Sequence, residues 1–219
     1  TPVRYKACAM DQMNQIVSKI ALMMVPVLLA ITVHEVCHGY AAYLFGDPTA
    51  KNAGRLTMNP VKHIDPVGLM VLFLTGIMGM AIGWAKPVPV DPRYFKKPRL
   101  DMVWVSLAGP ASNLVLATFT AIMLRPLATV LSGTVFNPIV DMAQFLVMIN
   151  VGLAIFNLIP IHPLDGSHIL EGLLPLRLAY SYSRLQPYGF IILLALIFTG
   201  AVNIIIFPII IFILNILLR

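Results

Sequence analysis

Apolar residues fill four long segments of the chain, and shorter stretches that carry most of the charges separate them. The four segments cover residues 16–45, 102–124, 139–159 and 188–218. Each is long enough to cross a bilayer as a helix, which takes about 20 residues. Asn203 and Pro208 interrupt the last segment, so it is either one long kinked helix or two short ones. This pattern predicts an all-α polytopic membrane protein with about four to six transmembrane helices.

A fifth apolar stretch, residues 67–84, is shorter and contains four glycines. It leads into a segment in which Pro87, Pro89 and Pro92 exclude a helix and favour extended backbone. We expect this stretch to dip into the membrane and return, as a short re-entrant element or a β-hairpin between the first and second long helices. It would then make no net crossing of the membrane.

Composition agrees with a membrane protein. Of the 219 residues, 59% are hydrophobic and only 11% are charged, whereas about 25% are charged in a typical soluble domain. The net charge of +6 is expected to report the orientation of the loops rather than nucleic-acid binding. If residues 67–84 do not cross, ten of the 15 Lys and Arg residues fall on the side where the first segment ends. The ten are Lys51, Arg55, Lys62, Lys86, Arg93, Lys96, Lys97, Arg99, Arg177 and Arg184. The positive-inside rule makes that side cytoplasmic.

The first segment contains the stretch HEVCH, in which His34 and His38 lie four residues apart and Glu35 follows the first histidine. Residues four apart share one face of a helix, so both imidazoles can approach one metal ion. Ionisable groups at membrane depth cost free energy, with estimates from about 2.5 kcal/mol each, and a bound ion would compensate for that cost. The spacing is typical of zinc sites in which Glu serves as the general base for a water molecule.

A catalytic zinc site keeps three protein ligands and one open position, so a third ligand must come from elsewhere in the chain. Asp165 is favoured because Pro160 and Pro163 break the chain around it, just after the third apolar segment. Irregular backbone is tolerated at membrane depth only where it is buried in protein or lines a cavity. His162 and His168 are rivals, either as ligands or as partners of Asp165. The full set of candidates is His63, Asp65, Asp91, Asp101, Asp141, His162, Asp165, His168 and Glu171.

Three motifs in this order resemble the site-2 protease family of intramembrane zinc metalloproteases: HEVCH, LAGPASN at residues 107–113 and NLIPIHPLDG at residues 157–166. GRLTMNPVKHIDPVG and GWAKPVPVDP resemble a compact prokaryotic branch of that family, without PDZ or CBS modules. The resemblance implies one Zn²⁺ per chain, held by His34, His38 and Asp165, with Glu35 as the general base. It also implies that Asn157 holds the substrate backbone or stabilises the oxyanion.

By the same resemblance the partners are single-span transmembrane proteins, cleaved in regulated intramembrane proteolysis. The chain would lie in the inner membrane of a prokaryotic cell, with its active site towards the cytoplasm. We expect residues 16–187 to form the catalytic membrane core and residues 188–219 to add the C-terminal transmembrane segment or segments. Residues 1–15 are a polar N-terminal segment that we set aside as processed or tag-derived.

Several residues are expected to support the site. Gly109 and Pro110 would permit close helix packing beside the metal, and Asn113, like Asn150, would mainly join helix to helix by hydrogen bonds. Val88 and Val90, in the stretch Pro87–Val90, are expected either to present an edge strand to which a substrate adds or to lie in a structural loop. His63 and Asp65 are expected in an exposed turn or, less favoured, as outer partners of the metal ligands.

Two other functions stay open from the sequence. An intramembrane metal transporter could also use HEVCH, although it would need a continuous polar path and has no need of Glu35. A prenyl-protein type of membrane metalloprotease would use Glu as the third ligand, and Glu171 is the only late Glu in the chain. Neither a nucleic-acid partner nor a sizeable soluble domain is expected.

Overall fold

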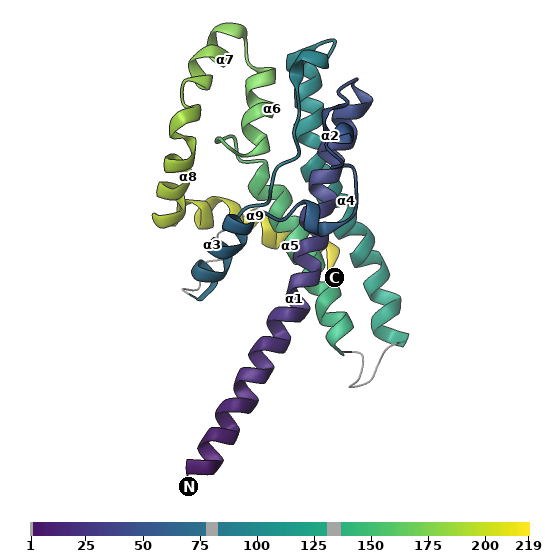
Figure 1. Ribbon diagram of the computed structural model, residues 1–219, viewed down its shortest axis with the longest axis vertical. Coiled ribbons are helices and arrows are strands. Elements are labelled where there is room, and N and C mark those ends of the chain that lie inside the picture. The colour runs from purple at the N-terminus through teal and green to yellow at the C-terminus, as the bar shows by residue number, and fades with distance from the viewer. Residues whose placement is uncertain (1, 78–82, 131–136) are drawn as a thin grey trace.

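The computed structural model describes residues 2–77, 83–130 and 137–219, and all regular structure in these residues is helical (Figure 1). The longest helices are α1 (Pro2–Leu44), α4 (Pro98–Val130) and α5 (Asn137–Asn157). Helices α6 (Asp165–Leu173), α7 (Leu176–Ser183), α8 (Gly189–Phe198) and α9 (Ala201–Leu217) follow. Short elements join them: α2 (Thr49–Asn52), α3 (Pro66–Ile77) and the 3₁₀ turns at Pro60–Lys62, Pro92–Tyr94 and Gln186–Tyr188. The expected all-α class is confirmed.

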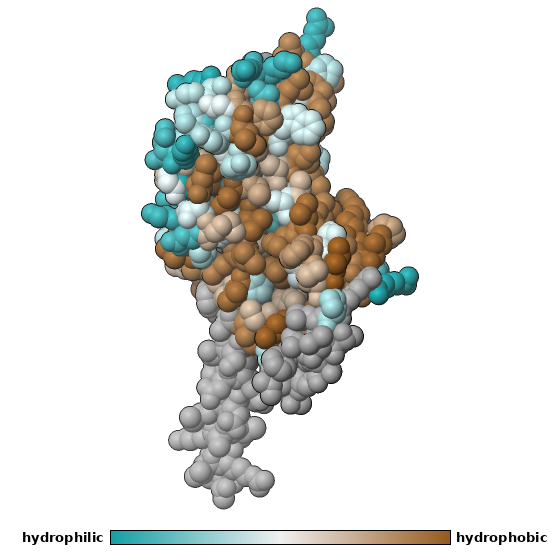
Figure 2. Space-filling view, turned by 90° about the vertical axis from the view of Figure 1, so that its right-hand side faces the viewer, coloured by the Kyte–Doolittle hydropathy of each residue, from teal (hydrophilic) through white to brown (hydrophobic). Residues whose placement is uncertain are grey.

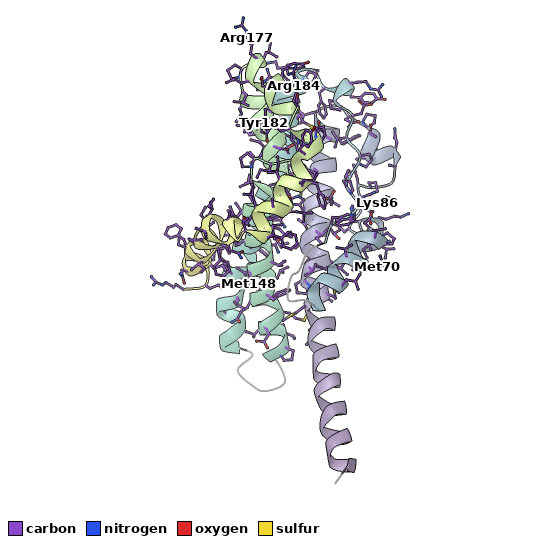
Figure 3. All side chains as sticks on the ribbon, turned by 90° about the vertical axis from the view of Figure 1, so that its left-hand side faces the viewer. Met70, Lys86, Met148, Arg177, Tyr182 and Arg184 are labelled. Atoms are coloured by element: carbon purple, nitrogen blue, oxygen red, sulfur yellow. The ribbon has the colours of Figure 1, made fainter. Side chains whose placement is uncertain are left out.

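Four helical stretches are long and apolar enough to cross a membrane: Leu22–Leu44, Pro98–Leu124, Pro138–Asn157 and Leu176–Phe198. The chain is therefore a multi-pass membrane protein. Figure 2 shows a broad band of hydrophobic side chains across the molecule and hydrophilic side chains gathered at its upper end. Arg177 and Arg184 lie at that same end (Figure 3).

Helices α1, α4 and α5 pack against one another and form the centre of the protein. Helix α1 ends and α4 begins at the same end of the molecule, so these two helices are antiparallel, and α5 returns towards that end (Figure 1). Alanines are fully buried where they meet, including Ala30, Ala117 and Ala154. Small residues allow helix backbones to approach closely, which is how helices associate without a hydrophobic driving force.

The last predicted segment, residues 188–218, consists of two helices rather than one kinked helix. Helix α8 ends at Phe198, and Gly200 adopts φ +75° before α9 begins. This left-handed conformation is readily adopted only by glycine, so the break is encoded by the sequence. Helix α9 then packs against α5 and α4, where Ile210 and Leu214 cover Val147 and Val151.

The expected re-entrant element or β-hairpin at residues 67–84 is not supported. The described residues contain no strand, and this stretch begins as helix α3. The following segment, residues 83–91, is extended but cannot pair as a strand. Pro87 and Pro89 have no N–H group, and the amides of Lys86 and Val88 donate to His63 and Glu35 instead.

The parts of the chain that precede and follow residues 67–84 nevertheless lie side by side. The Lys86 amide donates to the carbonyl of His63 at 2.9 Å. A Cβ atom placed on Gly68 would stand 2.1 Å from the carbonyl oxygen of Trp84, so the returning chain touches the start of the helix. We call residues 83–91 the strap, because they run from α3 back towards α4 along the last turns of α1, with contacts at Glu35 and Asp47 (Figure 1).

Candidate metal centre

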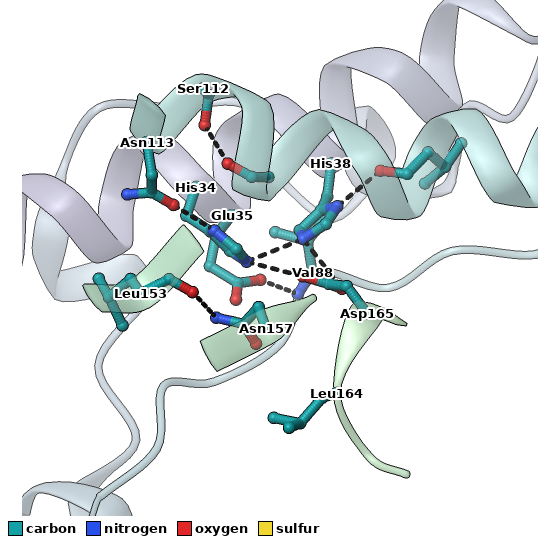
Figure 4. A network of polar contacts seen from close by, with 12 residues as sticks. His34, Glu35, His38, Val88, Ser112, Asn113, Leu153, Asn157, Leu164 and Asp165 are labelled. Carbon is teal, nitrogen blue, oxygen red and sulfur yellow. Dashed lines mark hydrogen bonds and ion pairs between the residues drawn. The ribbon is translucent and has the colours of Figure 1, made fainter. Parts of the chain in front are cut away.

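His34 and His38 project from one face of α1 and meet Asp165, the first residue of α6 (Figure 4). Their Nε2 atoms are 3.0 Å apart. The Nε2 atom of His34 is 3.1 Å from Oδ2 of Asp165, and that of His38 is 3.3 Å from Oδ1. These three residues form a group that can hold a metal ion, and the part of the chain that the structure describes contains no second group of this kind.

The spacing of these atoms fits zinc. Ligand atoms about 2.0–2.1 Å from a tetrahedral Zn²⁺ stand about 3.3–3.4 Å from one another, close to the 3.0–3.3 Å between these three side chains. Oδ2 of Asp165 is buried and makes no hydrogen bond, although His34 is its near neighbour. An unsatisfied carboxylate oxygen beside two imidazole nitrogens is the arrangement expected of a metal ligand.

The second nitrogen of each imidazole is also bound. Nδ1 of His34 is 2.5 Å from Oδ1 of Asn113, and Nδ1 of His38 is 2.7 Å from the carbonyl oxygen of Val105. Both acceptors lie on α4 and cannot donate, so each Nδ1 carries the proton and each Nε2 presents its lone pair to the centre of the group. Such outer contacts fix the orientation of metal-binding histidines.

Gly109 on α4 makes room for the two imidazoles. A Cβ atom at this position would stand 2.3 Å from Nε2 of His38 and 2.7 Å from Cε1 of His34. Any other residue would therefore displace both rings. Pro110, which follows it, is fully buried in the same helix. The expected close approach of α4 to the centre is present, and it depends on the glycine.

A second close approach places Asp165. A Cβ atom on Gly166 would stand 2.3 Å from the carbonyl oxygen of Leu158, so the start of α6 is pressed against the end of α5. The side chain of Ser167 turns back to the carbonyl of Leu164 at 2.6 Å and stabilises the same turn. The break after α5 and the glycine after Asp165 together aim the carboxylate at α1.

Glu35 lies beside the two histidines and is held by the strap. The amide of Val88 donates to Oε2 of Glu35 at 2.8 Å. Arg55 donates to the carbonyl of Lys86 at 2.6 Å, and the amide of Asp91 donates to the fully buried Asp47 at 2.7 Å. The position of Glu35 thus depends on a segment that is itself anchored at three points: Arg55, Asp47 and the His63 carbonyl.

The structure uses Val88 and Val90 differently from an open edge strand. The Val88 amide is taken by Glu35, and its side chain is buried. Val90 packs against the cluster of Ala42, Phe95 and Val105. Asn157 lies beside the centre (Figure 4) and donates through its side-chain nitrogen to the carbonyl of Leu153 at 2.9 Å.

The rival ligands lie outside the group. His162 is buried, and its Nδ1 atom is 3.0 Å from the Ser167 hydroxyl. Its ring lies edge-on to that of His168 and tilted against that of Tyr182. His63 is also buried and contacts the carbonyl of Thr57, so the exposed turn expected for it is wrong. The other candidates are not part of the group either: Asp65, Asp91, Asp101, Asp141 and Glu171.

Sequence reasoning missed the contacts made through the backbone. The carbonyl of Val105 orients His38, and the amide of Val88 orients Glu35. No pattern of side chains predicts either contact. Asp47, which anchors the strap, was not among the candidates. Its signal was the Asp-Pro-Thr sequence after α1, because an Asp at that place caps the following turn through the Thr49 amide.

Comparisons with known proteins agree with this site. The family model described as peptidase family M50 matches residues 22–200. A Bacillus subtilis (strain 168) protein named "Putative zinc metalloprotease YwhC" is 38% identical over 189 residues, which cover 85% of this chain and 84% of that protein. A Mycolicibacterium smegmatis protein named "Putative zinc metalloprotease Rip2" is 32% identical over 179 residues, which cover 80% of this chain and 66% of its own length. No solved structure gave a significant match.

Proposed function

We propose that this chain, which belongs to peptidase family M50, is a zinc-dependent endopeptidase that cleaves transmembrane segments of other membrane proteins. The observation that carries the proposal is the convergence of His34, His38 and Asp165 at 3.0–3.3 Å, with Glu35 beside them on a helix apolar enough to span the membrane. The family and the names of its relatives support a zinc metalloprotease. The position of the site within the helical bundle supports cleavage inside the membrane.

In this proposal His34, His38 and Asp165 are the three ligands. A bound zinc ion would supply a Lewis acid, which polarises the scissile carbonyl and makes a water molecule easier to deprotonate at neutral pH. Glu35 is the general base. Its Oε2 atom accepts a hydrogen bond from the Val88 amide, which leaves Oε1 to act as the base. Oε1 takes a proton from the attacking water and delivers it to the leaving amide nitrogen.

Asn157 is proposed to contact the substrate. One bond from its side-chain nitrogen goes to Leu153 within its own helix, and the amide group has two N–H donors. The second donor is available for a substrate carbonyl or for the oxygen that becomes negative during attack. The resemblance to site-2 proteases supports this role, since Asn157 holds the corresponding place before the Asp165 turn.

Water and substrate need a route to the centre. A cavity of about 390 Å³ opens between α4, α6 and α7, and Met102 and His168 are among the residues that line it. Met102 is one turn before Val105 on α4, and His168 is one turn after Asp165 on α6. We propose that this cavity leads to the site from the end of the molecule that carries Arg177 (Figure 3). The positive-inside rule makes that end cytoplasmic, as in the inner membrane of a prokaryotic cell.

Replacement of Glu35 by Gln tests the proposal. The purified chain and the Glu35→Gln variant would be incubated with a panel of single-span membrane proteins in vesicles, and the products would be separated by mass. Fragments should form only with the intact chain, while both proteins should hold zinc. Cleavage that persists in the variant would contradict the role of Glu35. Zinc flux into vesicles, unchanged by Glu35→Gln, would instead favour a transporter.

A further inference from the structure

A chain of buried amide groups runs from His34 on α1 through α4 to α5. Oδ1 of Asn113 is 2.5 Å from Nδ1 of His34, and Nδ2 of Asn113 is 2.6 Å from Oδ1 of Asn150. Nδ2 of Asn150 then donates to the carbonyl of Leu146 at 2.8 Å. Asn113 and Asn150 are both 0% exposed, so no water competes for these bonds.

The direction of every bond in this chain is determined by carbonyl oxygens. The carbonyl of Leu146 can only accept, so the nitrogen of Asn150 faces it and its oxygen faces Asn113. Asn113 must therefore present its nitrogen to Asn150. The carbonyl of Ala30 also accepts from this nitrogen, at the longer distance of 3.2 Å. The oxygen of Asn113 is left for His34, and Nδ1 of His34 has to be the donor.

We propose that Asn150 is a positioning residue for the metal centre, acting through Asn113 to hold His34 in the tautomer whose Nε2 can bind zinc. The proposal rests on the proposed function, because it takes His34 as a ligand. Asn150 does not contact the imidazole. Its effect is to prevent the Asn113 amide from turning over, which would offer His34 an N–H group and favour the wrong tautomer.

A plain packing role would leave a different signature. Hydrogen bonds between membrane helices generally add stability without any effect on a distant ligand. Such a bond would change the thermal midpoint of the protein, but neither the protonated nitrogen of His34 nor the affinity for zinc. Measurements that report on His34 itself therefore distinguish a positioning role of Asn150 from a packing role.

The experiment uses the full chain in detergent micelles with zinc affinity measured by competition against a coloured chelator. Asn150→Leu should weaken zinc binding about tenfold, at the lower end of the 10–100-fold losses typical of outer contacts to metal ligands. Asn203→Leu is the matched control, because Asn203 is exposed on α9 and outside this chain of bonds. In an Asn113→Leu background, Asn150→Leu should have no further effect on affinity, since it acts only through Asn113.

Nitrogen NMR gives the second readout. The chain has only five histidines, so ¹⁵N-labelled histidine in metal-free protein can report which nitrogen of His34 carries the proton. Asn150→Leu should mix the two tautomers, whereas the intact chain should show one. The hydroxyl in Asn150→Ser can donate to the Leu146 carbonyl and still accept from Asn113. This variant should therefore lose less zinc affinity than Asn150→Leu and show less mixing of the His34 tautomers.

The proposal is overturned if Asn150→Leu folds with unchanged affinity and a single His34 tautomer, or if its effect adds fully to that of Asn113→Leu. It is also overturned if Asn150→Ser loses as much zinc affinity as Asn150→Leu. Failure of the proposed function looks different, because the intact chain would then hold no zinc. In that case the tautomer measurement, made without metal, still decides whether Asn150 controls His34.

Discussion

A side-chain carbon on Gly109 would stand 2.3 Å from Nε2 of His38, the atom that faces the centre of the metal group. Real Cβ atoms do not approach other atoms so closely, so the imidazole would have to move. We predict that Gly109→Ala abolishes zinc binding while the helices still form. Gly152→Ala is the control, because a Cβ atom there meets nothing within 4 Å. Metal analysis of both variants decides the matter, and Gly109→Ala protein with a full complement of zinc would contradict the geometry.

The bond between the Val88 amide and Glu35 gives a second prediction. Val88→Pro removes the N–H donor, while Val88→Ala keeps it and shortens only the side chain. A hydrogen bond to a charged group is worth about 1.5–3 kcal/mol, so cleavage by Val88→Pro should fall by at least about tenfold with zinc retained. Val88→Ala should lose much less of the cleavage activity. Equal losses in the two variants would show that the side chain matters and the amide does not.

The anchoring of the strap can be tested at Arg55. Its guanidinium is buried and donates to the carbonyl of Lys86, two residues before Val88. Arg55→Met keeps the length of the side chain and removes the bond, so residues 83–91 should become more accessible to proteases in micelles. Arg177→Met is the control, since Arg177 is exposed on α7 and lies outside the strap and its anchors. Strap protection that is unchanged in Arg55→Met would rule out this anchor.

Removal of the metal should destabilise the protein. A ligand at 100 times its dissociation constant stabilises the folded state by about 2.7 kcal/mol. A chelator should therefore lower the thermal midpoint of the intact chain and of Glu35→Gln, whose ligands are complete. His38→Ala should show no such shift, because one ligand is missing. Equal chelator effects on all three proteins would place the stabilising ion elsewhere.

Much of the fold followed from the sequence. The long apolar segments predicted a multi-pass helical protein, and this class is confirmed. The spacing of His34 and His38 predicted that both would face one point, which is how the structure has them. The re-entrant element or β-hairpin expected at residues 67–84 is not supported, because a short apolar run does not distinguish a helix from a strand. The described part of this stretch is helical over Pro66–Ile77, and the strap returns to touch Gly68 near the start of that helix.

The support around the site could not be predicted for a different reason. The Val105 carbonyl and the Val88 amide act through the backbone, which every residue possesses. Their roles arise from the packing of α4 and the strap against α1, and not from the identity of either side chain. Asn113 and Asn150 were expected to join helices, but the sequence does not show that their bonds run in one direction towards His34.

Zinc per chain in the purified protein, intact and as Asp165→Ala, tests the central claim most directly. The account predicts about one zinc in the intact chain, as three protein ligands and one open position require, and a loss or strong reduction in the variant. Asp101→Ala, which removes a carboxylate outside the metal group, should keep its zinc. Full zinc in Asp165→Ala would contradict the account, because the third ligand would then lie elsewhere and the approach of α6 to α1 would have no part in binding.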